Sequence, residues 1–97
     1  MSAYVLVEIA VSDPEAFETY KALSTTALAV NGGRYLARGG AHELLEGVGD
    51  PGRVTLLEFP DADAARRWYD SPEYREARAA RADAATARFI LVEGVPE

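Results

Sequence analysis

The segment RWYDSPEYREAR, residues 66–77, carries the most distinctive side chains of the chain. It brings Trp68, Tyr69 and Tyr74 together, with Ser71 between them. Aromatic rings stack on planar ligands, and tyrosine or serine hydroxyls donate hydrogen bonds, so the segment could bind an aromatic metabolite. The alternative is packing, because aromatic rings supply much of the buried area of a small core. Ser71 has the further alternative of capping a helix that begins at the following proline.

The Arg-Gly-Gly sequence at residues 38–40 is a second candidate for ligand binding. Backbone N–H groups of a glycine turn can form an anion-binding nest, and the guanidinium of Arg38 beside it would pair with a carboxylate or enolate oxygen. Gly39 could equally serve a tight turn or β-bulge that needs a positive φ. No helix follows these glycines, so they are not a dinucleotide-binding fingerprint. Tyr20 and Arg81 complete the residues that we expect around the pocket.

Two residues are candidate general bases. His42 is the single histidine and belongs to the residue type that changes charge near neutral pH. Glu58 lies within an otherwise apolar segment, where burial would disfavour its charged form. The alternatives are a solvent-exposed His42 and a Glu58 that is paired or hydrated at the rim of a sheet. One histidine with scattered carboxylates does not predict a metal site.

The elements that must position these side chains follow from the hydrophobic pattern. Four segments rich in β-branched and apolar residues predict strands: residues 3–11, 34–38, 53–59 and 87–94. Residues 42–47 are expected to continue the second strand or to form a short hairpin arm. Asp13, followed by proline, predicts a helix that ends at the Asn-Gly-Gly of residues 31–33. Asp61 predicts the start of a second helix, and Pro72 breaks that helix.

The predicted order β-α-β-β-α-β, with the second helix broken, is that of a ferredoxin-like α+β fold. It places a four-stranded antiparallel sheet under helices on one face. Residues 1–97 are short enough to form a single domain. The other face of the sheet has no cover within the chain, so counting layers predicts a homodimer, a dimeric α/β barrel closed by two such sheets.

Three acidic residues interrupt the predicted strands: Glu8, Glu58 and Glu93. If their side chains share the uncovered face of the sheet, they point into the dimer interface. Burying carboxylates there requires arginine partners. The strands offer three such residues, Arg34, Arg38 and Arg88.

The composition argues against several classes of function. Sixteen acidic residues against ten basic ones give a net charge of −6, which argues against binding nucleic acid or an anionic membrane surface. The absence of cysteine excludes disulfides, thiolate metal sites and cysteine nucleophiles. No apolar run is long enough to cross a bilayer, and the first residues lack the pattern of a secretion signal. We therefore expect a cytoplasmic protein.

The segments YVLVEIAVSDPEAFETY, GGRYLARGG, LLEFPDADAARRWYDSPEYREAR and FILVEG resemble the family known as domain of unknown function 1330. The resemblance covers essentially the whole chain. It implies a dimeric α/β barrel in which two ferredoxin-like sheets face each other. Related families of that superfamily include cofactor-free monooxygenases, muconolactone-type isomerases and haem-handling enzymes. The resemblance implies a fold and a pocket location, and it implies no reaction.

Two positions depart from the pattern of that family. His42 stands where the family is expected to have an apolar or small residue, which weakens the case for a catalytic role of this side chain. Asp61 replaces the usual serine after Glu-Phe-Pro, which exchanges one helix cap for another.

Together these features predict a small homodimer that binds an aromatic or carboxylate-bearing metabolite between sheet and helices. Arg38 would hold the anion, Trp68 and Tyr74 would stack on the ligand, and Tyr69 or Ser71 would donate a hydrogen bond.

Whether the protein is an enzyme stays open from the sequence. As an enzyme it would catalyse an isomerisation or oxygenation without a cofactor, with Glu58 or His42 as the base. The alternative is a ligand-binding or accessory dimer without turnover. Haem handling is disfavoured because His42 alone would have to supply the axial ligand.

Overall fold

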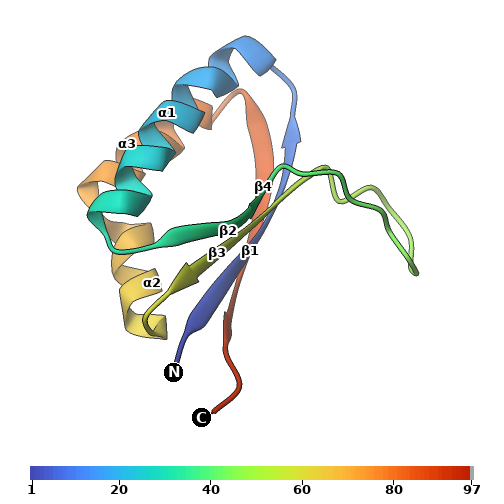
Figure 1. Ribbon diagram of the computed structural model, residues 1–97. Helices are drawn as coiled ribbons and strands as arrows, with labels where there is room; N and C mark the ends of the chain where they lie inside the picture. The colour runs from blue at the N-terminus through green and yellow to red at the C-terminus, as the bar shows by residue number, and fades with distance from the viewer. Residues whose placement is uncertain (97) are drawn as a thin grey trace.

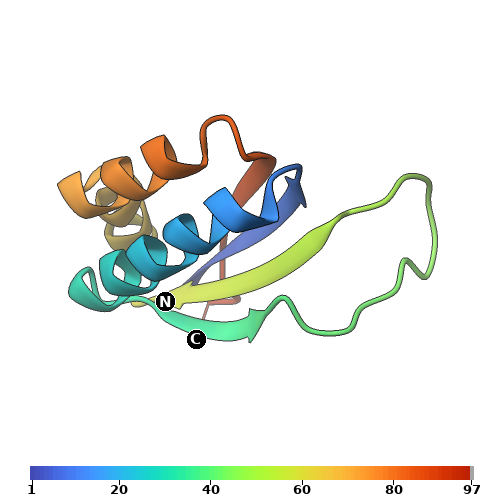
Figure 2. The ribbon, with the colours of Figure 1, turned by 90° about the horizontal axis from the view of Figure 1, so that it is seen from above.

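The computed structural model describes residues 1–96 and contains one four-stranded antiparallel sheet. The elements along the chain are β1 (Ala3–Val11), α1 (Pro14–Val30), β2 (Arg34–Arg38), β3 (Arg53–Phe59), α2 (Ala62–Asp70), α3 (Pro72–Arg81) and β4 (Ala85–Glu93). The strands lie in the order β2-β3-β1-β4, and all helices cover the same face of the sheet (Figures 1 and 2). This is the predicted ferredoxin-like fold, with its second helix divided into α2 and α3. No helix among the described residues is long and apolar enough to cross a membrane.

The two faces of the sheet differ in burial. Along β1, Val5, Val7 and Ile9 are buried, whereas Leu6 and Glu8 between them are half-buried. Successive side chains of a strand point to opposite faces of the sheet, so the first set lies under the helices and the second faces away from them. The face without helices is called the open face below.

The break between α2 and α3 is held by the hydroxyl of Ser71. Its Oγ donates a hydrogen bond to the Trp68 carbonyl at 2.7 Å and accepts one from the Tyr74 amide at 3.1 Å. The side-chain amide of Asn31 donates a further bond to it at 3.3 Å. One donor and two acceptor positions are all that a hydroxyl offers. Ser71 is therefore the cap of α3, and its hydroxyl has no capacity left for a ligand.

A register shift in β2 decides which of its residues face the helices. Tyr35 pairs with Leu57 of β3, but after the irregularity Arg38 pairs with Thr55. Directly paired residues share a face of the sheet. The bulge thus places Tyr35 and Arg38, three positions apart, together on the helix-covered face.

The segment after β2 differs from the prediction. Residues 42–47 form no strand, and the whole connection from Gly39 to Gly52 is an exposed loop that projects beyond the sheet (Figure 1). Leu45 is 87% exposed, so no burial stabilises a strand here. The last strand also begins at Ala85, two residues earlier than expected.

The acidic residues of the strands separate between the two faces. On the open face, Glu58 pairs with Arg34 at 2.5 Å and Glu8 pairs with Arg88 at 3.4 Å, as the need for arginine partners predicted. The expectation for Glu93 is wrong. It pairs with Ala3, which lies on the helix-covered face, and it stands near the end of β4 where it is exposed.

Candidate functional site

An aromatic cluster lies between the helices and the sheet. Trp68 and Tyr74 have ring centroids 4.4 Å apart, and Tyr69 lies 5.6 Å from Tyr74. Phe89 of β4 lies 5.8 Å from Tyr69. Trp68 and Tyr74 are 3% and 0% exposed. The rings that stood out in the sequence are therefore packed together. Trp68 also lines both of the cavities described below, Tyr69 lines one of them, and Tyr74 lines neither.

The first cavity, called the slot, lies between α1 and the sheet. Its volume is about 30 Å³, which is room for about two water molecules. A cross-strand row of side chains contributes to its wall: Arg38, Thr55, Val7 and Phe89 are successive partners across the sheet. Lys21, Tyr20, Arg53 and Trp68 are further lining residues.

The slot concentrates positive charge in an acidic chain. Its lining contains Lys21, Arg38 and Arg53, and no carboxylate is present among the described residues that line it. Lys21 pairs with Glu18 outside the slot at 3.2 Å. Within residues 1–96, neither Arg38 nor Arg53 forms an ion pair. With a net charge of −6, two unpaired arginines at one cavity create a local field that attracts anions.

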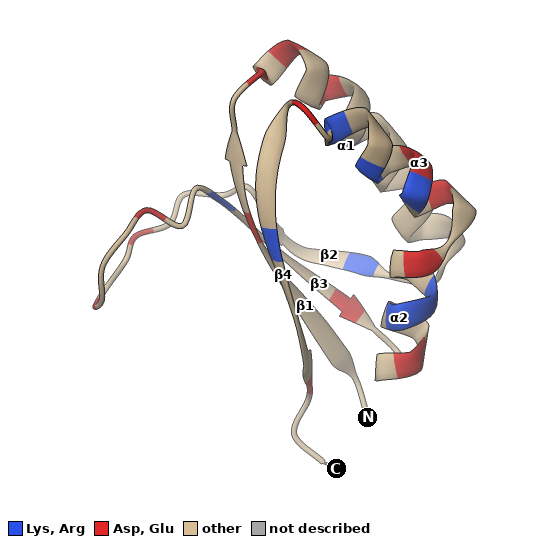
Figure 3. Cartoon of the chain, turned by 180° about the vertical axis from the view of Figure 1, so that it is seen from behind, with Lys and Arg blue, Asp and Glu red and all other residues tan. Residues whose placement is uncertain are grey.

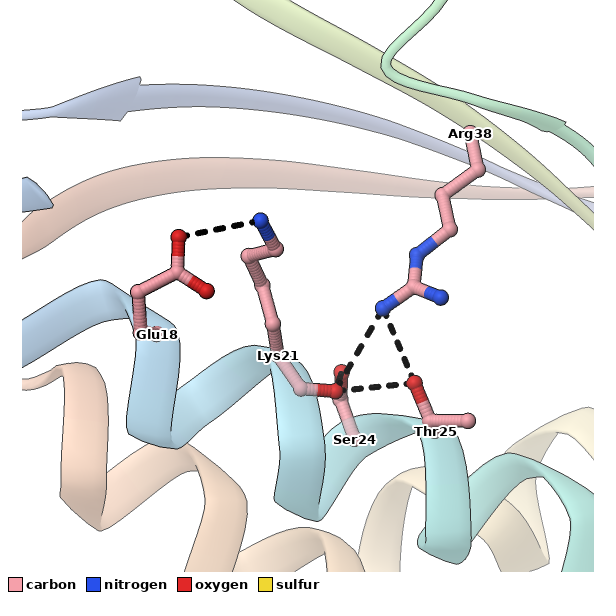
Figure 4. Close-up of polar contacts among 5 residues, drawn as sticks. All are labelled: Glu18, Lys21, Ser24, Thr25 and Arg38. Carbon is pink, nitrogen blue, oxygen red and sulfur yellow. Dashed lines mark hydrogen bonds and ion pairs between the residues drawn. The ribbon is translucent and has the colours of Figure 1, made fainter.

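Arg38 is held at the slot by contacts with α1 and its own strand. Its Nη2 donates to the hydroxyl of Thr25 at 2.8 Å and to the carbonyl of Lys21 at 3.4 Å (Figure 4). Its guanidinium lies 4.5 Å from the ring centroid of Tyr35. The same guanidinium keeps other N–H groups for a ligand, because it has five donors in all.

Gly39 makes room for the side chain of Arg53 and does not form an anion-binding nest. Its amide donates to the carbonyl of Val54 at 2.8 Å and continues the sheet, so it is not free to form the predicted nest. Its φ is +60°, and a Cβ there would lie 2.6 Å from the guanidinium carbon of Arg53. The missing side chain thus leaves the space that Arg53 occupies, 5.9 Å from the Phe17 ring centroid.

Two buried hydroxyls stand at the inner end of the site. Tyr20 of α1 and Tyr74 of α3 share a hydrogen bond of 2.8 Å. Burial raises the pKa of Tyr20, and the bond to Tyr74 offsets this only in part. Burial also raises the pKa of Tyr74, with a further contribution from Tyr20, while the nearby Arg81 guanidinium opposes both shifts. Both hydroxyls therefore stay protonated at neutral pH and act as hydrogen-bonding groups.

The second cavity, called the groove, lies between α2 and the edge strand β4. Its volume is about 280 Å³, close to the lower limit for sites that bind small molecules. Its walls and rim comprise Val5, Ala65, Arg66, Trp68, Tyr69, Asp70, Phe89 and Leu91. Trp68 and Phe89 border the slot as well.

The two candidate bases lie away from both cavities. Glu58 is on the open face, paired with Arg34, because strand alternation directs it opposite to Leu57 and Phe59. His42 lies in the exposed loop, where its Nδ1 contacts the carbonyl of Gly40 at 2.9 Å. No cluster of three potential metal ligands occurs in residues 1–96.

The structure adds residues to the site that the sequence analysis missed. Lys21 and Arg53 supply two of its three cations. The sequence could have indicated Thr55, because this residue alternates with the apolar Leu57 along β3. The structure shows that Thr55 is buried. Nothing in the sequence near Arg53 indicates that it meets Phe17, because that contact joins separate elements.

Comparison with known proteins gives a family and a fold. Residues 2–95 match the family described as Domain of unknown function (DUF1330). No curated protein matches the chain significantly. Among solved structures, the chain is similar to a protein of unknown function from Rhodopseudomonas palustris, with 24% identity and a TM-score of 0.74 over 99% of this chain and 84% of that one.

Two further structures share the fold at lower identity. One is SnoaB, a cofactor-independent oxygenase from Streptomyces nogalater, with 17% identity and a TM-score of 0.67 over 99% of this chain and 95% of the oxygenase. The other is a dimeric ferredoxin-like protein of unknown function from Thermobifida fusca, with 17% identity and a TM-score of 0.58 over 96% and 91% of the two chains.

Replacing Gly39 should disturb the slot through Arg53. The Gly39→Ala variant places a methyl group where the guanidinium now lies and strains a positive φ, so we expect a loss of roughly 1 kcal/mol in unfolding free energy. Urea denaturation measures it. Gly40→Ala is the matched control, because a Cβ at that position meets nothing within 4 Å. Equal stability of the two variants would contradict the packing described.

The buried hydroxyl pair predicts a loss of stability at alkaline pH. A tyrosine whose pKa is raised in the folded state contributes stability that is complete below the ordinary value of 10.0 and declines as the pH rises above it. Each such group lowers the unfolding free energy by ~1.4 kcal/mol per pH unit while only the unfolded chain ionises. Urea denaturation between about pH 9 and about pH 11 should show this decline. In Tyr74→Phe the decline should be shallower, and an unchanged slope would refute the assignment.

Proposed function

Since the chain belongs to the DUF1330 family, whose description assigns no activity, we propose from its site that it binds a small aromatic or carboxylate-bearing metabolite at the slot. The observation that carries this proposal is the pair of unpaired arginines, Arg38 and Arg53, at a cavity whose described lining has no carboxylate. Charge-assisted hydrogen bonds from guanidinium groups to a carboxylate are among the strongest polar contacts in proteins.

The size of the slot decides which part of the ligand enters it. About 30 Å³ admits a carboxylate group and excludes a whole aromatic ring. The oxyanion would lie between Arg38 and Arg53, and the hydroxyl of Tyr20 would donate a hydrogen bond to it. The rest of the ligand would lie outside the slot, beside the half-buried ring of Tyr35.

Binding without turnover is the function that this geometry favours. Glu58 and His42 are outside both cavities, so neither candidate base is placed to take a proton from a ligand in the slot. What the slot offers is stabilisation of negative charge, which suits a carboxylate or an enolate.

A second candidate function is a cofactor-independent oxygenation or isomerisation of the bound anion. The fold shared with the oxygenase from Streptomyces nogalater favours testing oxygenation first. Such a reaction requires a substrate that ionises readily by itself, with the enolate held by Arg38 and Arg53. Oxygen uptake with enolisable phenols and no added cofactor measures it. If the protein binds the phenol but consumes no oxygen and leaves the ligand unchanged, the result contradicts oxygenation and isomerisation and supports the non-catalytic function.

We further propose that the protein works as a homodimer joined through the open face. Leu6 of β1 lies between Leu56 of β3 and Ile90 of β4, forming an apolar row across the sheet. Ile90 and Val92 are 41% and 52% exposed. The charged residues of this face form the ion pairs Glu58–Arg34 and Glu8–Arg88, and Figure 3 shows the charged positions along the strands. A second copy would bury this row, and the similar protein from Thermobifida fusca is described as dimeric.

The arginines of the slot can be tested with benzoate as the probe. Loss of a charge-assisted contact costs about 1.5–3 kcal/mol, so Arg38→Gln should weaken benzoate binding by about ten- to a hundredfold. Isothermal titration calorimetry measures the affinity. Arg75→Gln is the matched control because Arg75 is exposed on α3 and does not line either cavity. If Arg38→Gln binds benzoate as tightly as Arg75→Gln does, the slot is not an anion site.

The dimer can be tested by placing a charge in the apolar row. The Ile90→Lys variant should elute as a monomer, because burying an unpaired ammonium group is strongly unfavourable. The unmodified chain should elute with twice the chain mass in size-exclusion chromatography with light scattering. Val30→Lys, at an exposed position at the end of α1, should remain dimeric. A monomeric unmodified protein at micromolar concentration would contradict the proposal.

A further inference from the structure

The slot carries more positive charge than a single carboxylate neutralises. Lys21, Arg38 and Arg53 are its three cations, and no carboxylate occurs among the described residues that line it. Only Lys21 has an ion-pair partner within residues 1–96, and this partner, Glu18, lies outside the slot. Like charges that share one small cavity repel each other, so the two arginines require compensation. One bound carboxylate compensates one of them, and a second negative charge on the same ligand would compensate the other.

The ammonium group of Lys21 is held by a solvent-exposed contact alone. Its Nζ lies 3.2 Å from Oε1 of Glu18, whose side chain is 68% exposed. The two residues are three positions apart on α1, and exposed pairs of this kind contribute little to stability because water screens them. An ammonium group has three N–H donors, and Glu18 accepts one hydrogen bond from it. Lys21 can therefore bind an anion together with Glu18 or in its place.

Lys21 and Arg38 direct their charges into the same space. Figure 4 shows the ammonium of Lys21 and the guanidinium of Arg38 between α1 and the strands, one extending from the helix and the other from β2. Nη2 of Arg38 also donates to the backbone carbonyl of Lys21 at 3.4 Å, so the two residues are in contact. Arg38 is exposed and Lys21 is half-buried. Both charges are therefore accessible to a group that remains outside the slot.

The volume of the slot keeps two anionic groups of one ligand apart. About 30 Å³ admits a single carboxylate. A second carboxylate would remain outside, where the ammonium of Lys21 offers N–H donors that Glu18 does not use. The guanidinium of Arg38 lies 4.5 Å from the ring centroid of Tyr35, so a planar ring that joins the two carboxylates would have an aromatic surface beside it.

We propose that the ligand of the slot is an aromatic dicarboxylate, which carries two negative charges at neutral pH. One carboxylate would lie between Arg38 and Arg53, and the other would pair with Lys21 outside the slot. With Glu18 included, three positive charges then face three negative ones. This inference rests on the proposed binding of a carboxylate at the slot, and it adds a second charge on the ligand and a role for Lys21.

Two ligands of the same shape separate the effect of charge from that of size. Isophthalate has two carboxylates in meta positions on a benzene ring, and its monoamide replaces one of them with a neutral amide group. Isothermal titration calorimetry should show that isophthalate binds about tenfold more tightly than the monoamide, because it forms one more charge-assisted contact.

Variants assign this preference to Lys21. Lys21→Gln keeps a polar side chain and removes its charge, so isophthalate and the monoamide should bind this variant with similar affinities. Arg75→Gln is the matched control, because it removes one positive charge from an exposed position on α3 that lines neither cavity. It should keep the preference of the unmodified protein. Both ligands are measured on each variant, so a general loss of stability does not imitate the loss of preference.

The benzoate experiment separates this inference from the proposal on which it rests. If Arg38→Gln weakens benzoate binding but isophthalate binds no more tightly than its monoamide, the slot is an anion site and the dicarboxylate inference is wrong. The inference is also wrong if Lys21→Gln keeps the preference to the same extent as Arg75→Gln does. If Arg38→Gln leaves benzoate binding unchanged, the slot is not an anion site and both proposals are overturned.

Discussion

The hydroxyl of Ser71 joins the end of α2 to the start of α3, and the position of the aromatic cluster depends on this junction. The hydroxyl bonds to the Trp68 carbonyl and to the Tyr74 amide within one helix break. The two rings are thereby held 4.4 Å apart although their helices run in different directions. Tyr74 then reaches Tyr20 of α1 through a buried hydroxyl pair. A local cap thus connects three helices over the sheet, which is why we assign Ser71 a structural role.

Trp68 and Phe89 of this cluster border two cavities of different chemistry. On the slot side, Arg38 and Arg53 stand unpaired among the described residues and present guanidinium groups to a narrow cavity. On the groove side, mainly apolar and aromatic side chains surround a wider one. Trp68 belongs to both walls. Charge and volume therefore differ on the two sides of one side chain: the slot is narrow and lined by cations, and the groove is wider and mainly apolar.

The arrangement of charge also separates the two faces of the sheet. On the open face, Glu58 and Glu8 each have an arginine partner, so this face is locally neutral and otherwise apolar. On the helix-covered face, Arg38 has no carboxylate partner among the described residues. A face that is neutral and apolar suits association with a second copy, and a face with uncompensated positive charge suits an anionic ligand.

Most of the fold could be predicted from the sequence because its signals are local. Proline after an aspartate or serine predicted the helix caps and the helix break. Glycines after the first helix and the apolar pattern of β1 helped to predict the order of the elements along the chain, and that order indicated the ferredoxin-like fold. The site was predicted in part. The cluster of Trp68, Tyr69 and Tyr74 was visible, since its members are neighbours in the chain.

Tertiary structure alone decided which polar groups line the slot beside Trp68. The bulge in β2 turned Arg38 toward the helices, and the missing side chain of Gly39 made room for Arg53. Strand register kept Glu58 out of the slot and the groove and placed Glu93 on the face opposite to the one expected. Caps and periodicity are encoded within a few residues, whereas a binding site depends on register and on contacts between distant segments. A shift of one residue in a strand reverses every side chain, and short sequence patterns do not determine such a shift.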